Sequence, residues 1–349
     1  MRVIPKDKVI FSFNAEHPCQ YSVEDGETFW VETDDCYSGQ ITDASVKRPD
    51  IDITIMDCSV GPIEVRGAKP GDTLCVEILA IELGRQGVMV TSKGLGVLGD
   101  RITEADTKVI PIEDGFACFS DKIRLPLTPM VGVCGVAPRP GLDIHCAVPG
   151  DHGSNMDTKM VKAGARVYLP VSVPGAGLAV GDLHACMGDG ELSGTGIETP
   201  GRICLKTTLY KDRPVSRPVI ETVEALYFTA SAVTLDDAIR LAVSDTVAFL
   251  EKKLELDFQP IIVIGEVHAV PDGDDPDARV AQVFQLHKPA AVAAGEAGKI
   301  LDDENIVLVG HESPTHLLIA LALLKCVAGA VAVFKKRQRA VWKVRCYKV

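Results

Sequence analysis

The chain has 349 residues, of which 46% are hydrophobic and 24% are charged. This length gives room for a large core in one or two domains, and the composition excludes a disordered or fibrous chain. The formal net charge is −12 and no cluster of basic and aromatic residues precedes the extreme C-terminus, which argues against nucleic acid as a partner.

Strands and turns dominate the first part of the chain. Three segments, 26–33, 71–83 and 163–173, begin at or beside a glycine and continue into β-prone apolar residues. We therefore expect a mainly β fold, with a β-sandwich or barrel-like body over residues 1–215 that carries the polar site. The eleven cysteines form no C-x-x-C pair, and the start of the chain lacks the apolar stretch of a secretory signal. Reduced thiols and a cytoplasmic location are expected.

The first clear helical pattern covers residues 234–253. Thr234 can cap its N-terminus, and apolar residues recur on one face at helical spacing, which predicts that the helix packs on a sheet. A buried strand is expected at 260–270 and an exposed acidic loop at 270–278. Together these elements predict a smaller α/β portion over residues 216–290.

The remaining tail, residues 291–349, is rich in alanine and its structure is uncertain from the sequence. Within it, the apolar segment 317–334 is nearly long enough to span a bilayer and is followed by KKRQR. Lys325 falls at its centre, where membrane insertion costs roughly 2.5 to 3.5 kcal/mol. We favour a buried or interface helix over a membrane span and expect no membrane partner.

Residues 181–201, GDLHACMGDGELSGTGIETPG, concentrate chemically active side chains. Side chains alternate in a strand, so Asp182, His184 and Cys186 would share one side while their apolar neighbours face the core. An Asp-x-His pair offers a zinc-like ion one carboxylate oxygen and one imidazole nitrogen. An Asp–His hydrogen bond in a β-turn region explains the same pair, and both interpretations stay open on these two residues alone.

Glycines follow the Asp-x-His pair closely. They allow a close approach of backbone and can aim amide N–H groups at an oxyanion, the candidates being Gly188, Gly190 and Gly194. Asp189 and Glu191, between them, offer a general base or further ligands. A second polar cluster over residues 145–159 contains His145, Asp151, His152, Asn155 and Asp157.

Six segments, taken in order and spacing, resemble the acetamidase/formamidase family of small-amide hydrolases. These are PGDHGSNMDTK, GDLHACMGDGELSGTGIE, GVLGD, PLTPMVGVCGVAP, IPIEDG and SAVTLDDAIRLAVSDTVAFL. The resemblance runs from residue 1 to about residue 255. It implies a mostly β, two-part, homo-oligomeric subunit that hydrolyses a short carboxamide, such as formamide or acetamide, to a carboxylate and ammonia. It also implies a divalent metal, commonly zinc, with calcium as a further candidate.

The family motifs fall on particular residues of this chain. The motif H-G-G-N-M-D falls on residues 152–157, with Ser154 in place of the second glycine, and G-D-L-H-A-x-M-G-D-G-E falls intact on 181–191. The family's x is usually not a ligand, so Cys186 is expected as a thiol in the pocket wall. By this resemblance the expected metal ligands are His152, Asp182, His184 and Asp35. The expected catalytic residues are Glu191, Asp189 and Asn155.

On this hypothesis a metal-activated hydroxide attacks the amide carbon, and Glu191 or Asp189 passes its proton to the leaving ammonia. Backbone amides of the glycine loop would hold the oxyanion. Two alternatives stay open. A metal-independent amidase would use Cys186 as its nucleophile, with a histidine as base. A β protein that holds calcium as a structural staple and catalyses nothing would use the oxygen ligands Asp151, Asn155, Asp157, Asp189 and Glu191.

Overall fold

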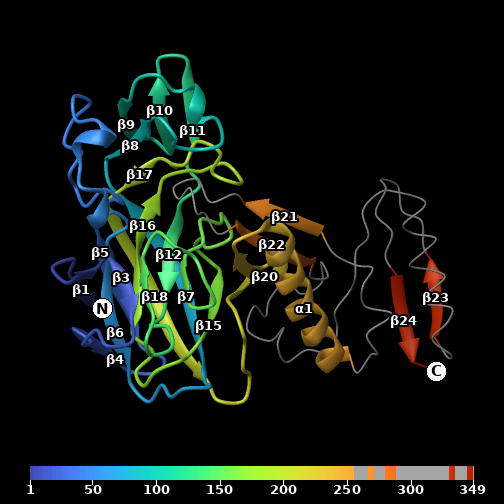
Figure 1. The fold of residues 1–349 in the computed structure, drawn as a ribbon. Helices are drawn as coiled ribbons and strands as arrows, with labels where there is room; N and C mark the ends of the chain where they lie inside the picture. The colour runs from blue at the N-terminus through green and yellow to red at the C-terminus, as the bar shows by residue number, and fades with distance from the viewer. Residues whose placement is uncertain (255–265, 271–279, 288–329, 335–343, 349) are drawn as a thin grey trace.

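The computed structural model describes residues 1–254, 266–270, 280–287, 330–334 and 344–348 (Figure 1). Within this part of the chain, one sheet has nine strands. Their spatial order is β1 (Arg2–Ile4), β5 (Thr28–Thr33), β18 (Gly201–Tyr210), β7 (Thr73–Leu83), β15 (Arg166–Pro170), β19 (Val219–Glu221), β20 (Ala225–Ala232), β22 (Val280–His287) and β21 (Glu266–Val270).

A second sheet contains eleven of the described strands. Eight follow one path: β11 (Ile123–Pro126), β10 (Phe116–Ser120), β9 (Asp106–Glu113), β8 (Gln86–Thr91), β17 (Glu198–Thr199), β16 (Leu178–His184), β12 (Met130–Gly135) and β14 (Gly153–Asn155). Off this path, β6 (Ser59–Val65) pairs with β16 and also with β2 (Val9–Ile10) and β4 (Tyr21–Val23). Two small sheets pair β3 (Ser12–Asn14) with β13 (Asp143–His145) and β23 (Ala330–Phe334) with β24 (Val344–Lys348).

Apolar side chains of both sheets meet in one core. Strand β5 alternates between buried and partly exposed residues, because one of its faces turns toward the other sheet. The core contains Val31, Val76 and Leu205 from the first sheet together with Val60, Val180 and Leu183 from the second. Two sheets that share a core in this way form a sandwich, so the predicted mainly β fold is confirmed.

The one α-helix among the described residues, α1 (Leu235–Leu254), covers the other face of the first sheet (Figure 1). Its N-terminus is capped by Thr234, whose Oγ1 accepts a hydrogen bond of 3.2 Å from the backbone N–H of Asp237. Val247 and Leu250 pack with Phe228 of β20. The helix begins and ends within one residue of the predicted segment. None of the described helices combines the length and the apolar character needed to cross a membrane.

The segments after the helix are described in part. Strand β22 pairs with both β20 and β21, so these strands continue the sheet of the body. Of the strand predicted at 260–270, only β21 is described. Residues 271–278 of the predicted acidic loop lie outside the described residues. The apolar segment 317–334 also lies outside them, except for β23. The division of the chain at residues 215 and 290 stays a prediction.

Strand β16 changes its facing at Asp182, and this change positions the polar site. Leu178 and Val180 point into the core, and regular alternation would send residue 182 there as well. The φ angle of Asp182 is instead 55°, a left-handed conformation that aspartate tolerates better than most residues. Leu183 therefore occupies the core, and Asp182 and His184 reach a pocket at the end of the strand.

Candidate active site

A pocket lies where the ends of β16, β14 and β17 meet two loops. Strand β16 contributes Asp182 and His184, and the turn after β14 contributes Asp157. Asn155 comes from β14 and Glu198 from β17, and the remaining lining residues come from the loops around residues 36–57 and 191–195. The complete lining is Cys36, Tyr37, Arg48, Met56, Asp57, Asn155, Asp157, Asp182, His184, Glu191, Gly194, Thr195 and Glu198.

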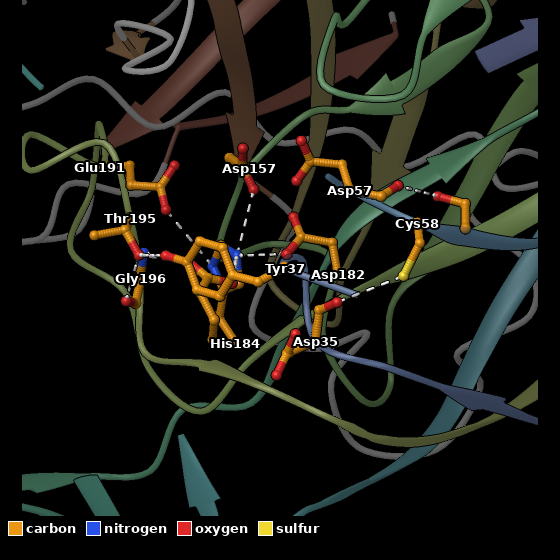
Figure 2. Close-up of polar contacts among 12 residues, drawn as sticks. Asp35, Tyr37, Asp57, Cys58, Asp157, Asp182, His184, Glu191, Thr195 and Gly196 are labelled. Atoms are coloured by element: carbon orange, nitrogen blue, oxygen red, sulfur yellow. Dashed lines mark hydrogen bonds and ion pairs between the residues drawn. The ribbon is translucent and has the colours of Figure 1, made fainter. Parts of the chain in front are cut away.

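The imidazole of His184 lies among four carboxylates, those of Asp157, Asp182, Glu191 and Glu198. Figure 2 labels the first three. Its Nε2 lies 3.0 Å from Glu198 Oε2, 3.2 Å from Asp182 Oδ1 and 3.8 Å from Asp157 Oδ1. Its Nδ1 lies 4.0 Å from Glu191 Oε1. His184 is 1% exposed, so water does not screen these interactions as it would at the surface.

Glu198 is fixed from its other side by the loop that precedes it. Its Oε1 accepts hydrogen bonds from the backbone N–H of Gly196 at 2.7 Å and from Thr195 Oγ1 at 3.1 Å. The hydroxyl groups of Thr195 and Tyr37 lie 3.0 Å apart (Figure 2). Glu198 therefore has little freedom to turn away from His184.

The pKa values of these groups depart from their usual range because the groups are buried together. Burial raises the pKa of Glu191 well above its ordinary value, and the charge of Asp157 raises it further. Burial raises the pKa of Glu198 to about 7, although the charge of His184 acts against this. For His184 burial acts downward, but the charges of Glu198 and Asp182 outweigh it and raise its pKa well above normal. For Asp182 burial acts upward, and interactions with His184 and Glu198 outweigh it and lower the pKa.

The backbone beneath the pocket carboxylates is unusual. Four of the carboxylate residues have a positive φ: Asp57 at 54°, Asp157 at 37°, Asp182 at 55° and Glu191 at 37°. Non-glycine residues adopt this region rarely, and it recurs at functional sites because the surrounding structure enforces it. The fold thus accepts backbone strain in order to direct these side chains into one pocket.

Several residues expected from the sequence come together in this pocket. Asp182, His184, Glu191 and Asn155 all line it, as does Gly194. The N–H of Gly194, however, donates to the carbonyl of Glu191 at 2.7 Å, so it closes a turn and is not directed at an oxyanion. The other two loop glycines, Gly188 and Gly190, are not among the lining residues.

Two of the expected metal ligands do not reach the pocket lining. The imidazole of His152 packs edge-on against Phe13, with ring centroids 5.2 Å apart. Asp35 is buried beside the pocket, where its Oδ1 accepts a hydrogen bond of 2.9 Å from the N–H of Gly39. The four-ligand set predicted from the sequence is therefore not assembled in this structure, which brings together only Asp182 and His184.

Two further candidates also lie away from the pocket. The side chain of Asp189 is 75% exposed and pairs with Lys159 at 2.8 Å, so it has no contact with the lining. Cys186 packs beside Ile197 in an apolar cluster, and burial raises the pKa of its thiol. The expected position of Cys186 in the pocket wall is corrected accordingly, because the strand ends at His184 and its alternation ends there.

Glu198, Asp57 and Cys36 line the pocket although the sequence interpretation did not name them, and Asp157 was named only as an oxygen ligand of the calcium alternative. Glu198 ends the second family-like motif, and Asp157 ends the H-G-S-N-M-D match, so their motifs offered a signal for both. Asp57 and Cys36 belong to no motif with a chemical meaning. They reach the pocket because β6 pairs with β16, which brings the end of the 36–57 loop next to Asp182.

The residues present fit a divalent cation. Three sets of buried residues could each hold an ion, because within each set the donor atoms lie within 4.8 Å of one another. The sets are Cys36, Asp57 and Asp182; Asp157, His184 and Glu191; and Asp182, His184 and Glu198. The carboxylates of the lining outnumber its basic groups, Arg48 and His184. Asn155 Oδ1 is buried and accepts no hydrogen bond from the described residues. Buried carboxylates with too few positive partners are stabilised by a metal ion.

The fold and the pocket define a class: a β-sandwich protein with a buried cluster of carboxylates and an imidazole that lines a pocket. Within that class the chain belongs to the acetamidase/formamidase family, whose model matches residues 6–147 and 143–234. The chain is 30% identical over 248 residues to a formamidase of Methylophilus methylotrophus, with 54% of this chain and 61% of that protein covered. It is 28% identical over 275 residues to an acetamidase of Mycolicibacterium smegmatis, with 59% and 68% covered.

A solved structure of an acetamidase from Bacillus halodurans is similar with a TM-score of 0.78 and 38% sequence identity, covering 82% of this chain and 97% of that one. The similarity therefore includes nearly all of the Bacillus fold. The chain spans only about three fifths of the length of the Methylophilus formamidase.

Proposed function

We propose that this protein hydrolyses short carboxamides, of the size of formamide or acetamide, to a carboxylate and ammonia with the help of a bound divalent metal. Membership of the acetamidase/formamidase family supports the reaction class. The observation that supports a bound metal is the buried imidazole of His184 among four carboxylates. A cation accounts for this excess of negative charge without requiring that several of the acids stay protonated.

The ligands proposed for the metal are Asp182, His184 and Glu198, whose donor atoms lie within 4.8 Å of one another. Two carboxylates and one imidazole suit zinc, the first candidate. A bound cation would supply Lewis-acid activation of water and of the amide carbonyl. We propose Glu198 as a ligand in place of His152 and Asp35, because Glu198 Oε2 lies 3.0 Å from His184 Nε2 and those two residues do not line the pocket.

Glu191 is proposed as the proton carrier. It takes a proton from the attacking water while the water oxygen bonds to the amide carbon, and it returns the proton to nitrogen as the C–N bond breaks. A carboxyl group does this best when its pKa lies near the working pH, and burial moves the pKa of Glu191 in that direction. Asn155 Oδ1, which has no donor among the described residues, is proposed to accept an N–H of the substrate amide.

The experiment is a comparison of stripped and reloaded protein. The purified chain is treated with a chelator, reloaded with zinc or calcium, and assayed for ammonia release from formamide and acetamide. We expect activity in the zinc-loaded form and little in the stripped form. Equal ammonia release before and after stripping would refute the metal role, and no release from either amide in any form would refute the reaction.

A calcium-binding protein without catalysis is the second candidate, because oxygen donors predominate in the lining and calcium prefers oxygen ligands. It predicts that calcium raises the melting temperature and that no form releases ammonia. Homo-oligomeric assembly and a cytoplasmic location also stay predictions, and light scattering of the purified protein tests the first of them.

A further inference from the structure

Two glycines lie directly against the Asp182–His184 pair. Gly132 belongs to β12, where Val131 pairs with Leu183 and Val133 pairs with Gly181, so Gly132 stands opposite Asp182. A Cβ atom on Gly132 would lie 2.0 Å from Asp182 Oδ2 and 2.7 Å from Asp157 Oδ1. The space that a side chain would fill is therefore occupied by the carboxylates of the site.

Gly196 has the same relation to the imidazole. A Cβ atom there would lie 2.7 Å from His184 Nδ1 and 2.9 Å from His184 Cγ. The N–H of Gly196 also donates to Glu198 Oε1 at 2.7 Å. Gly196 thus contacts two groups of the site. Its α-carbon lies against the imidazole of His184, and its backbone N–H donates to the carboxylate of Glu198.

The backbone at these two positions does not require glycine. Neither residue is among those with a positive φ, so alanine could adopt the same backbone conformation without strain. What alanine lacks is room, because ordinary contacts between carbon and its neighbours are about 3.5 to 4.0 Å. Asp182 and His184 are 2% and 1% exposed, respectively, so a methyl group added at either glycine must displace a buried side chain.

We infer that Gly132 and Gly196 are positioning residues that set the carboxylate of Asp182 and the imidazole of His184 in the orientation in which they share one ion. The inference rests on the proposed metal site and deepens it. Because Gly132 has no side chain, the carboxylates of Asp182 and Asp157 can pack directly against β12. Because Gly196 has none, the imidazole of His184 can keep its present plane. An added methyl group at either position turns a ligand away while the backbone stays as it is.

The test uses the full chain with Gly132→Ala and Gly196→Ala, and with Val131→Ala as the matched control. Val131 neighbours Gly132 on the same strand but is buried in the core between the sheets, so its truncation destabilises the fold without touching the ligands. For each protein the zinc Kd is measured by chelator competition, and the melting temperature is measured with and without zinc.

We expect the zinc Kd of both glycine variants to rise about 10- to 100-fold, the range found when groups that orient metal ligands are altered. Their gain in melting temperature on zinc addition should shrink with it. Val131→Ala should melt at a lower temperature without zinc and keep the wild-type Kd. The two glycines lie on separate segments, so if one variant does not fold, the other decides.

A wild-type zinc Kd in a folded glycine variant overturns the inference. So does an equal loss of zinc affinity in Val131→Ala, because the effect would then follow from lower stability alone. If the unaltered protein binds no zinc, the proposed metal site itself fails, and that result is separate from any result on the glycine variants.

Discussion

Replacing Glu198 by glutamine should remove a pH dependence that the metal-free protein owes to a single buried carboxyl group. Glutamine keeps the shape of the side chain and can still accept the hydrogen bonds from Gly196 and Thr195. It cannot ionise. The difference in stability between the two proteins at several pH values therefore reports the titration of Glu198 together with its effect on the pKa of His184.

The size of the effect follows from the pKa of Glu198, which is 4.5 in an unperturbed carboxyl group and about 7 in this pocket. Between these values the folded state holds a proton that the unfolded state has lost. The stabilisation is complete below pH 4.5 and is lost as the pH rises through 7. At 1.36 kcal/mol for each pKa unit, it amounts to about 3 kcal/mol in full and about 2.5 kcal/mol between pH 5 and pH 8.

The assay is urea unfolding of the chelator-treated proteins at pH 5, 6, 7 and 8, followed by tryptophan fluorescence, to which Trp30 in β5 contributes, and by circular dichroism. Wild-type protein should lose about 2.5 kcal/mol more stability over this range than Glu198→Gln. The raised pKa of His184 adds a decline in the same direction, and because the charge of Glu198 is one of its causes, Glu198→Gln makes this second decline smaller as well. Equal pH slopes for the two proteins would refute the reasoning, because Glu198 would then ionise with an ordinary pKa.

Further predictions concern the metal and the reaction. The gain in melting temperature on zinc addition should grow from pH 6 to pH 8, since ligands must lose protons to bind; a constant gain would contradict this. Asp182→Asn should lower kcat/KM for formamide by about 100-fold, whereas Asp189→Asn, which alters an exposed carboxylate, should stay within about twofold. Equal losses in the two would remove the assignment. Glu191→Gln should lower kcat by about 10²- to 10⁴-fold with an unchanged zinc Kd. Cys186→Ser should keep full activity, and its loss would revive the thiol mechanism.

Local patterns were sufficient for part of the site. The Asp-x-His spacing predicted that Asp182 and His184 share one side of a strand, and both line the pocket. Glu191 belongs to the same segment, so its proximity follows from the short distance along the chain. Cys186 was wrongly placed, because the prediction extended strand alternation beyond His184, where β16 ends.

The ligand set could not be completed from spacing. His152 and Asn155 are neighbours in the sequence, yet Asn155 lines the pocket and His152 packs against Phe13. Which side a residue of a tight turn faces depends on its φ and ψ angles and on what packs against it, and the sequence pattern contains neither. Asp35 likewise satisfies its carboxylate within its own turn.

By itself, the sequence determined the mainly β architecture, the helix at 235–254 and the family, because these depend on periodicity and on motifs that are contiguous in the chain. Only the tertiary structure decided that Glu198 and Asp157 lie against His184 and that Asp57 lies beside Asp182. These residues come from separate segments of the chain. The pairing of β16 with β17 and β6, together with positive φ angles at Asp57 and Asp157, brings their side chains to one pocket. The need for glycine at position 132 likewise follows only from the tertiary structure, because the carboxylate of Asp182 occupies the space that a side chain there would fill.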